Sequence, residues 1–203
     1  MSIPNSLTLL RILLTPVFVF LLLHDSPLYQ QLSVAVYIVA ALTDWYDGWV
    51  ARRYGYTTRW GKFLDPLADK ILSAAALFTF VSLGLAEAWM VWIIVARDFL
   101  ITSLRSYAEW IDQPIVTSRS AQAKTFGEFV VIYYILLLHV AKTVPMLQRD
   151  FGSLIEMLLQ PEVLFGMLLL VTLSTIGTGL LYLFENRTFL FALYGRLRSP
   201  RPS

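Results

Sequence analysis

The sequence contains no cysteine and only two histidines among its 203 residues. The absence of cysteine excludes disulfides, thiolate nucleophiles and sulfur-ligated metal sites, and it leaves the redox compartment undetermined. Charge is also scarce, because charged residues make up 15% of the chain and the formal net charge is +2. A nucleic-acid-binding domain usually carries a basic stripe, so this charge balance argues against a nucleic-acid partner.

Apolar residues, by contrast, are abundant. They make up 57% of the chain, and the mean hydropathy is +0.64. This composition is too apolar for an ordinary soluble domain and predicts an integral membrane protein. A membrane-crossing helix needs about 20 residues, and no alternating pattern suggests a β-barrel. The stretches long enough to cross are Leu7–Leu23, Leu32–Val50, Leu67–Leu83, Ala88–Ala108, Ala121–Ala141 and Glu162–Phe184.

We therefore expect an all-α integral membrane protein: a bundle of six transmembrane helices forming a single domain over residues 1–203. Lys and Arg are concentrated in the segments on one side, which predicts that both termini face the cytoplasm. The short segment Gly84–Glu87 predicts a tight hairpin, and the longer Lys142–Pro161 segment predicts a short interfacial helix. The basic tail, residues 196–203, is expected to be flexible and attracted to anionic lipid.

Charge gathers in residues 44–69, from the end of the second predicted helix to the start of the third, and this stretch contains four aspartates. Residues three or four apart share a face of a helix. Asp44 and Asp47 should therefore project together from the end of the second helix, and Asp65 and Asp69 from the start of the third. A short cytoplasmic loop between the two helices would then bring four carboxylates to one place.

A cation must lie among these carboxylates, because they would otherwise repel one another strongly in a region of reduced dielectric. Arg52 and Lys70 are near enough in sequence to supply it. A divalent metal is the stronger candidate, since hard cations prefer oxygen ligands. With no His or Cys nearby, Mg²⁺ or Mn²⁺ fits better than Zn²⁺. Two ions would suit a clamp on phosphate oxygens.

Small residues flank the aspartates and leave room for a ligand. Gly48 and Ala51 continue the faces of the second-helix pair, and Gly61 lies one turn before Asp65. A glycine costs a helix about 1 kcal/mol relative to alanine, which suggests a packing or ligand role. Each feature also has a purely structural interpretation. Asp65 could cap a helix that begins at Pro66, and the glycines could serve helix packing.

The second-helix pair has its own structural alternative, because Asp44 and Asp47 could be solvated residues paired with Arg52 and Arg53. The complete constellation, however, resembles the motif of the CDP-alcohol phosphotransferase family. The pattern is Asp44-x2-Asp47-Gly48-x2-Ala51-Arg52-x8-Gly61-x3-Asp65-x3-Asp69, with every fixed position filled. The resemblance extends through IPNSLTLLR (Ile3–Arg11) and ARDFLITSLR (Ala96–Arg105), and beyond about Glu128 it reduces to hydrophobic helices.

The resemblance implies transfer of a substituted phosphate from a CDP-linked donor to an alcohol, with release of CMP. It implies that Asp44, Asp47 and Asp65 are metal ligands, and that Asp69 is the catalytic base and also a candidate ligand. It further implies a homodimer surrounded by membrane lipids. The residues that it implies for the nucleotide and its diphosphate are Gly48, Ala51, Arg52, Gly61, Asn5 and Thr8.

Within the family, IPNSLTLLR and ARDFLITSLR are most similar to the members that join CDP-diacylglycerol to glycerol 3-phosphate, giving phosphatidylglycerophosphate. A phosphorylated acceptor needs its own cationic site. Arg97 and Arg105 lie roughly on one helix face, and Arg119 and Lys124 follow at the cytoplasmic start of the fifth helix. Intramembrane Arg marks a functional site and holds phosphate through its fork. Alternatively, Arg97 pairs with an acid such as Asp98, and Arg105 and Lys124 are ordinary positive-inside residues.

The dipeptide Arg97-Asp98 departs from the Arg-Glu common in members that use glycerol 3-phosphate. Arg-Asp also occurs in related cardiolipin synthases, whose acceptor is phosphatidylglycerol, and inositol phosphate or serine are further alternatives. A different class, a divalent-cation transporter, also uses intramembrane carboxylates, but here the acids cluster at one membrane face without an inverted repeat. We expect a multi-pass enzyme of the inner (cytoplasmic) membrane whose active site faces the cytoplasm.

Overall fold

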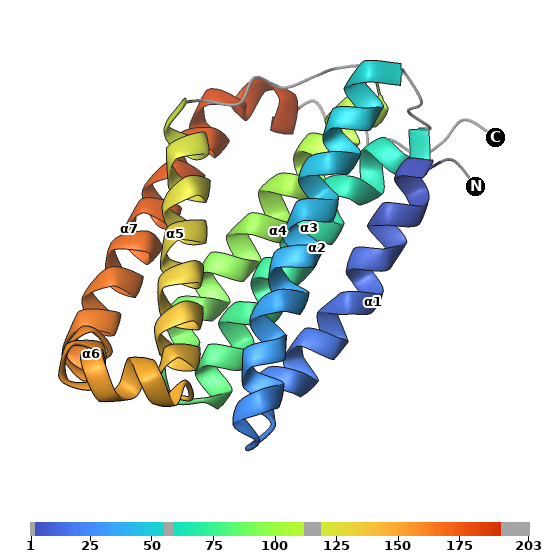
Figure 1. Cartoon of the computed structure of the whole chain (residues 1–203). Helices are drawn as coiled ribbons and strands as arrows, with labels where there is room; N and C mark the ends of the chain where they lie inside the picture. The colour runs from blue at the N-terminus through green and yellow to red at the C-terminus, as the bar shows by residue number, and fades with distance from the viewer. Residues whose placement is uncertain (1–2, 55–58, 112–118, 192–203) are drawn as a thin grey trace.

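The computed structural model describes the backbone of residues 3–54, 59–111 and 119–191, and within these ranges the side chains of residues 8–43, 66–111 and 123–191. This part of the chain is helical throughout apart from short turns and contains no strand (Figure 1). The structure therefore confirms the all-α prediction.

Six of the described helices run along a bundle, and a shorter seventh lies across one end of it (Figure 1). The long helices have 21 to 28 residues, whereas α6 has 14. The bounds are α1 Ile3–Leu23, α2 Pro27–Tyr54, α3 Arg59–Ser82, α4 Ala88–Trp110, α5 Arg119–Ala141, α6 Pro145–Leu158 and α7 Pro161–Glu185.

Two described segments are long and apolar enough to cross a membrane: Ala123–Ala141 of α5 and the whole of α7. Shorter apolar stretches form most of α1 and the first part of α2, at Thr8–Leu23 and Pro27–Thr43. These findings agree with a membrane protein. The six spans and the orientation of the termini stay predictions.

The predicted hairpin between α3 and α4 is confirmed, and its geometry explains where α3 ends. Gly84 has a φ of +71°, a left-handed conformation that side-chain-bearing residues rarely adopt. The N–H of Gly84 donates to the Val81 carbonyl at 3.0 Å, and the N–H of Leu85 donates to the Phe80 carbonyl at 2.8 Å. This pair of bonds is a Schellman motif, which satisfies the last carbonyls of α3.

The motif helices extend further toward their connection than the sequence predicts. α2 continues to Tyr54 instead of ending near Val50, and α3 already begins at Arg59. Pro66 consequently lies inside α3. The interpretation of Asp65 as a cap before a helix-starting proline is therefore wrong, because Asp65 is itself within the helix. The motif aspartates are carried by helix interiors and not by helix ends.

The apolar core occupies the half of the bundle that includes the α3–α4 turn and α6. α1 packs against α2 and α3, while α7 packs against α4 and α5. The Phe18 and Tyr37 rings pack in a tilted arrangement at a 5.0 Å centroid distance, and Tyr37 meets Tyr133 edge to face at 5.4 Å. Other fully buried members of this core are Leu22, Ala76, Phe80, Met90, Ile94, Ile132, Ile135 and Leu136.

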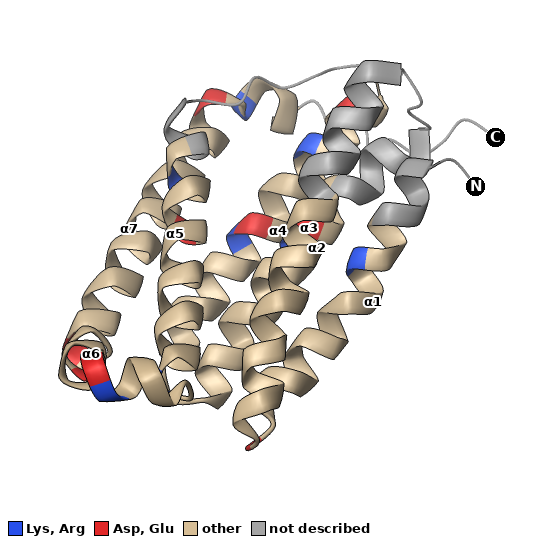
Figure 2. Ribbon diagram, viewed as in Figure 1, with Lys and Arg blue, Asp and Glu red and all other residues tan. Residues whose placement is uncertain are grey.

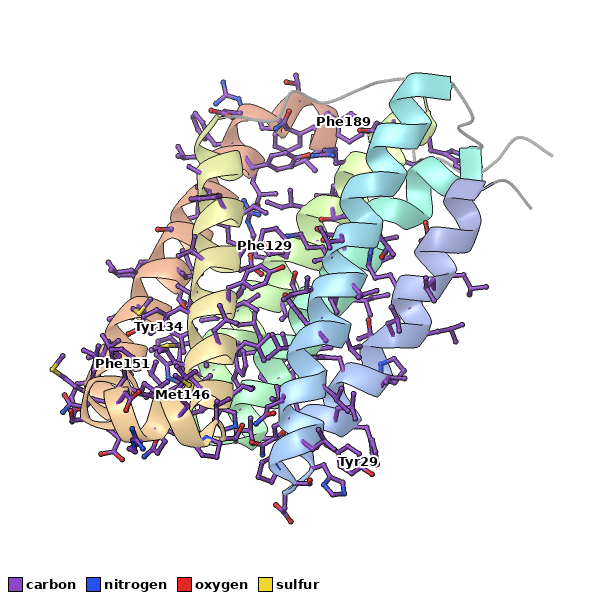
Figure 3. All side chains as sticks on the ribbon, viewed as in Figure 1. Tyr29, Phe129, Tyr134, Met146, Phe151 and Phe189 are labelled. Atoms are coloured by element: carbon purple, nitrogen blue, oxygen red, sulfur yellow. The ribbon has the colours of Figure 1, made fainter. Side chains whose placement is uncertain are left out.

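The helix predicted in the Lys142–Pro161 segment is confirmed as α6. Pro145 occupies its first turn, where a missing N–H carries no cost. The Tyr134 hydroxyl on α5 donates to the Leu158 carbonyl at 2.8 Å and ties the end of α6 to the bundle. Met146 and Phe151 remain exposed on α6 (Figure 3). These exposed apolar side chains suit an interfacial position, which stays a prediction.

Candidate active site

Charged residues are unevenly distributed along the bundle. In Figure 2 the helices are almost free of charge in the half toward α6, except at its very end. In the other half, segments coloured for Lys, Arg, Asp and Glu lie along α3, α4 and α5. The same half contains the polar buried residues Arg11, Asp98, Lys124 and Glu128. This is also the half into which α2 and α3 carry the motif aspartates.

Asp98, on α4, is the centre of a buried ion network. Its side chain is 3% exposed and accepts bonds from three cations. The Lys70 ammonium on α3 lies 2.8 Å from Oδ2, and the Lys124 ammonium on α5 lies 2.6 Å from Oδ1. The Arg97 Nη1 donates to Oδ1 at 3.1 Å. One carboxylate therefore joins three helices.

Lys124 is shared between two carboxylates. Its ammonium donates to Glu128 Oε2 at 2.7 Å, one turn along α5, in addition to its bond with Asp98. The Lys124 side chain is 1% exposed and that of Glu128 is 4% exposed. Lys124 is therefore enclosed in the protein and is not a solvated residue at the membrane surface. Among the printed ion pairs of the described residues, three cations contact two carboxylates, and Asp69 adds a further negative charge that acts on Lys70.

Arg97 extends the network to α7. Its Nη2 donates to the Thr178 hydroxyl at 3.0 Å, and that hydroxyl donates in turn to the Ser174 carbonyl at 2.7 Å. A side chain at position 179 would press on the arginine, because a Cβ there would lie 3.2 Å from the Arg97 Cγ. Gly179 thus leaves room for the stem of Arg97. The alternative that Arg97 pairs with Asp98 is confirmed as a contact.

Arg105 lies two turns beyond Arg97 on α4 and is more accessible. Its Nε is 3.5 Å from Glu109 Oε1, and both side chains are 42% exposed. Exposed pairs of this kind contribute about 0.3–0.5 kcal/mol to a helix, so this contact adds little stability. Arg105 also acts electrostatically on Tyr182 of α7.

α1 contributes a buried polar stripe to the same half of the bundle. Thr8, Arg11 and Thr15 are all buried, with Arg11 only 1% exposed. The spacing places them on one face, and the Thr15 hydroxyl donates to the Arg11 carbonyl at 2.9 Å. Thr8 is one of the predicted nucleotide-site residues. Arg11 was not predicted as a site residue, although it closes the IPNSLTLLR segment.

The described part of the site contains five of the residues predicted from sequence. Thr8 is buried on α1, Asp69 is half-buried on α3, and Arg97 and Lys124 join the network around Asp98. Arg105 stands apart from that network on the same face of α4. The other predicted side chains lie outside the described residues: Asn5, Asp44, Asp47, Gly48, Ala51, Arg52, Gly61, Asp65 and Arg119. The basic tail, residues 196–203, is outside them as well.

The backbone nevertheless shows how the motif aspartates are carried. Asp44 and Asp47 belong to α2 at a spacing of three, and Asp65 and Asp69 belong to α3 at a spacing of four. Each pair therefore shares a helix face. Among the residues whose side chains are described, no group of three or more His, Asp or Glu lies close enough to hold a metal ion.

Three partners in the ion network were not predicted as site residues. Lys70 was considered only as a cation for the aspartates, Asp98 only as a partner for Arg97, and Glu128 not at all. One signal for Glu128 was available, since Lys124 and Glu128 have the i, i+4 spacing of a helical ion pair. The bonds to Asp98 from α3 and α5 join residues 28 and 26 positions away, which no local pattern indicates.

Comparison with known families identifies the class of the protein. The model of the CDP-alcohol phosphatidyltransferase family matches residues 1–175, and the chain belongs to this family. It is therefore a transferase, which favours the enzyme over the divalent-cation transporter. Members of the family generally use divalent metal ions. The family and the apolar helices together indicate a membrane protein.

Individual relatives narrow the comparison further. A protein of Bacillus subtilis (strain 168) is 35% identical over 148 residues, covering 67% of this chain and 77% of the relative. One from Rickettsia bellii is 32% identical over 136 residues, covering 67% and 75% respectively. A third, from Salmonella paratyphi A, is 33% identical over 144 residues, covering 66% and 76%. All three bear the name CDP-diacylglycerol–glycerol-3-phosphate 3-phosphatidyltransferase.

Proposed function

We propose that this protein transfers the phosphatidyl group of CDP-diacylglycerol to glycerol 3-phosphate, giving phosphatidylglycerophosphate and CMP. The observation that carries the proposal is the shared name of the relatives across about two thirds of the chain. The buried cationic network supports it, because a phosphorylated acceptor requires positive charge beside the reacting centre. Asp69 immediately precedes Lys70, which is a member of that network.

The four motif aspartates fit a divalent-metal site by their donor chemistry, since Mg²⁺ and Mn²⁺ prefer carboxylate oxygens. Asp44, Asp47, Asp65 and Asp69 would hold the metal, with two ions as the proposed number. When bound, the ions polarise the diphosphate and stabilise the charge of the departing CMP.

Asp69 acts as the general base in this proposal. The acceptor hydroxyl is a weak nucleophile, so a carboxylate that takes its proton as the bond forms lowers the barrier. The acceptor oxygen bonds to the phosphatidyl phosphorus while the bond from that phosphorus to the bridging oxygen of CMP breaks. Transfer is direct, because positioning and charge stabilisation suffice for phosphoryl chemistry and no covalent enzyme intermediate is needed.

The donor's nucleotide would lie against the motif positions of α2 and α3 and the start of α1. The small motif residues would leave space for it, and Arg52 would bind the diphosphate. Thr8 is buried on α1 in the described part of this region. The acyl chains would remain between the helices. The proposed donor residues are Gly48, Ala51, Arg52, Gly61, Asn5 and Thr8.

The acceptor phosphate would be bound on the α4–α5 side. Arg97, Arg105, Arg119 and Lys124 are the proposed ligands. Arg97 and Lys124 are already oriented by Asp98 at 3.1 and 2.6 Å, so they are pre-organised and need little reordering on binding. Arg105 is half-exposed and could receive the phosphate as it enters from water.

The proposed setting is the inner (cytoplasmic) membrane, where the chain is a single six-span domain over residues 1–203, with both termini and the active site toward the cytoplasm. A homodimer is part of the proposal. The charged half of the bundle supports this orientation, because it contains the basic residues that the positive-inside rule places on the cytoplasmic side.

The experiment that tests the function is CMP release from CDP-diacylglycerol by the purified protein, with Mg²⁺ or Mn²⁺ and one alcohol at a time. The alcohols are glycerol 3-phosphate, phosphatidylglycerol, inositol phosphate and serine. We expect release with glycerol 3-phosphate at least tenfold faster than with any other (order of magnitude from a buried phosphate contact). Faster release with another alcohol would contradict the proposed acceptor.

Arg105→Ala tests the acceptor site separately. Removing a half-exposed guanidinium should raise the KM for glycerol 3-phosphate about tenfold, because a bond to a charged group contributes about 1.5–3 kcal/mol. The KM for CDP-diacylglycerol should stay within about twofold. Arg149→Ala is the matched control, since Arg149 lies on α6 with its side chain 87% exposed. Equal changes in both KM values would remove Arg105 from the acceptor site.

A further inference from the structure

Tyr182, on α7, combines near-complete burial with an unsatisfied hydroxyl. The residue is 1% exposed, and its hydroxyl has no hydrogen-bond partner among the residues that the structure describes. Buried hydroxyls are normally paired, because burial without a partner is unfavourable. Phenylalanine would fill the same volume without this cost. The retained hydroxyl therefore points to a partner that binds only at some stage of the protein's work.

The cations near Tyr182 indicate what kind of partner this is. α4 and α7 pack side by side. Glu87, just before the first residue of α4, and Glu162, the second residue of α7, line the same pocket. The two helices therefore run in the same direction (Figure 1). Arg97 reaches α7 at Thr178, one turn before Tyr182. At 1.5 Å per residue, Tyr182 lies about 6 Å beyond that contact, and Arg105 lies about 12 Å beyond Arg97.

Tyr182 is thus level with the interval between the two arginines. Both Arg97 and Arg105 act electrostatically on its side chain. The Nε of Arg97 is also buried without a hydrogen-bond partner among the described residues. The neutral Tyr182 hydroxyl and the cationic Arg97 Nε are therefore two donors without a described partner, on facing helices, and the Arg105 guanidinium also acts on Tyr182. Donors of this kind suit an anion with several oxygens, such as a phosphate monoester.

We propose that the Tyr182 hydroxyl donates a hydrogen bond to the phosphate of the acceptor alcohol, between Arg97 and Arg105. This inference rests on the proposed function and adds a residue to it. Tyr182 lies beyond residue 175, where the match to the family model ends. A directional neutral donor would help to distinguish a phosphorylated acceptor from a plain alcohol.

The test is Tyr182→Phe, which removes only the hydroxyl. Initial rates of CMP release are measured with each substrate varied in turn. We expect the KM for glycerol 3-phosphate to rise about tenfold or more, as for a lost bond to a charged group. The KM for CDP-diacylglycerol and kcat should stay within about threefold. An unchanged KM for glycerol 3-phosphate would overturn the proposal.

Thermal unfolding separates binding from a structural role. Without ligand, Tyr182→Phe should unfold at the wild-type temperature or higher, since the variant loses an unsatisfied group. The stabilisation given by glycerol 3-phosphate, which follows from binding to the folded state, should shrink. Tyr134→Phe is the matched control, because its hydroxyl is bonded to Leu158. That variant should unfold at a lower temperature and keep both KM values. A lower unfolding temperature for Tyr182→Phe with unchanged ligand stabilisation would also overturn the proposal.

The wild-type rates keep this proposal distinct from the proposed function. If wild-type protein releases CMP with glycerol 3-phosphate and Tyr182→Phe behaves identically, the function stands and the role of Tyr182 fails. If the wild type prefers another phosphorylated acceptor, the proposed function fails, and a KM rise for that acceptor in Tyr182→Phe upholds the role of Tyr182. If the wild type uses only an unphosphorylated alcohol, both fail.

Discussion

The two halves of the bundle are held together by different interactions. Toward α6, buried aromatic and aliphatic side chains such as Phe18, Tyr37 and Phe80 interdigitate without charge. In the other half, the interior contains Asp98, Lys124 and Glu128, each almost fully enclosed. The same helices α3, α4, α5 and α7 run through both halves, so the difference lies in side chains and not in architecture (Figure 2).

The comparison separates a half built on apolar packing from a half built around buried charge. Apolar packing tolerates exchange of similar side chains at modest cost. A buried ion network is a weaker source of net stability, because desolvation offsets much of its attraction. Its presence here is better explained by a need for oriented charge beside the motif aspartates. Mutations in the charged half should therefore lower activity, whereas mutations in the apolar half should lower stability alone.

The largest effect is expected for Asp69→Asn. The variant keeps the shape of the side chain but loses the proposed base, so kcat for CMP release should fall by about 10²–10⁴. Asp25→Asn is the control. It makes the same change at an exposed position in the turn between α1 and α2, at the end of the bundle opposite to the motif aspartates. It should leave the rate unchanged. A rate for Asp69→Asn within tenfold of wild type would exclude Asp69 as the base.

Asp98→Asn should have the next largest effect. It removes the charge that joins Lys70, Arg97 and Lys124, and breaking a buried pair costs about 3–5 kcal/mol. Misplaced phosphate ligands should also lower kcat/KM for the acceptor about a hundredfold. The checks are the unfolding temperature in detergent and the rate of CMP release.

Asp98→Glu is the matched control for that variant. It keeps the charge and should recover most of the acceptor kcat/KM. If Asp98→Asn and Asp98→Glu lowered the acceptor kcat/KM equally, the shape of the side chain, and not its charge, would matter at this position.

The smallest effect on activity is expected in the apolar half. Phe80→Ala should lower the free energy of unfolding by about 3 kcal/mol, because Phe80 is fully buried. Both KM values should stay within about twofold of wild type. Phe20→Ala is the control, since Phe20 is 65% exposed on α1, and it should change stability little. A raised acceptor KM in Phe80→Ala would show that the two halves are coupled.

The helices and the family could be predicted from sequence because both depend on local patterns. Apolar runs of the required length marked all six long helices, and Gly84 marked the hairpin. The spacing of Asp44, Asp47, Asp65 and Asp69 carried the family resemblance, which the family match bears out. The errors were at helix ends, where α3 continues through Pro66 to Arg59 and overrides a plausible cap signal.

The ion network could not be predicted, because it depends on which helices meet. Asp98 was expected at most to pair with its neighbour Arg97, yet its shortest contacts are with Lys124 and Lys70. Likewise, nothing in the sequence near Tyr182 indicates that α7 faces Arg97. Helix-to-helix contacts of this kind follow from the packing of whole faces, which a single sequence specifies only weakly.

The bond from Arg97 to Thr178 spans 81 residues of sequence, and this has a consequence for biosynthesis. A growing chain makes α4 long before α7, so Arg97 is made before its hydroxyl partner exists. The proposed acceptor site is therefore completed only when α7 docks. Chains interrupted before α7 would retain the motif aspartates and lack the α7 side of that proposed site.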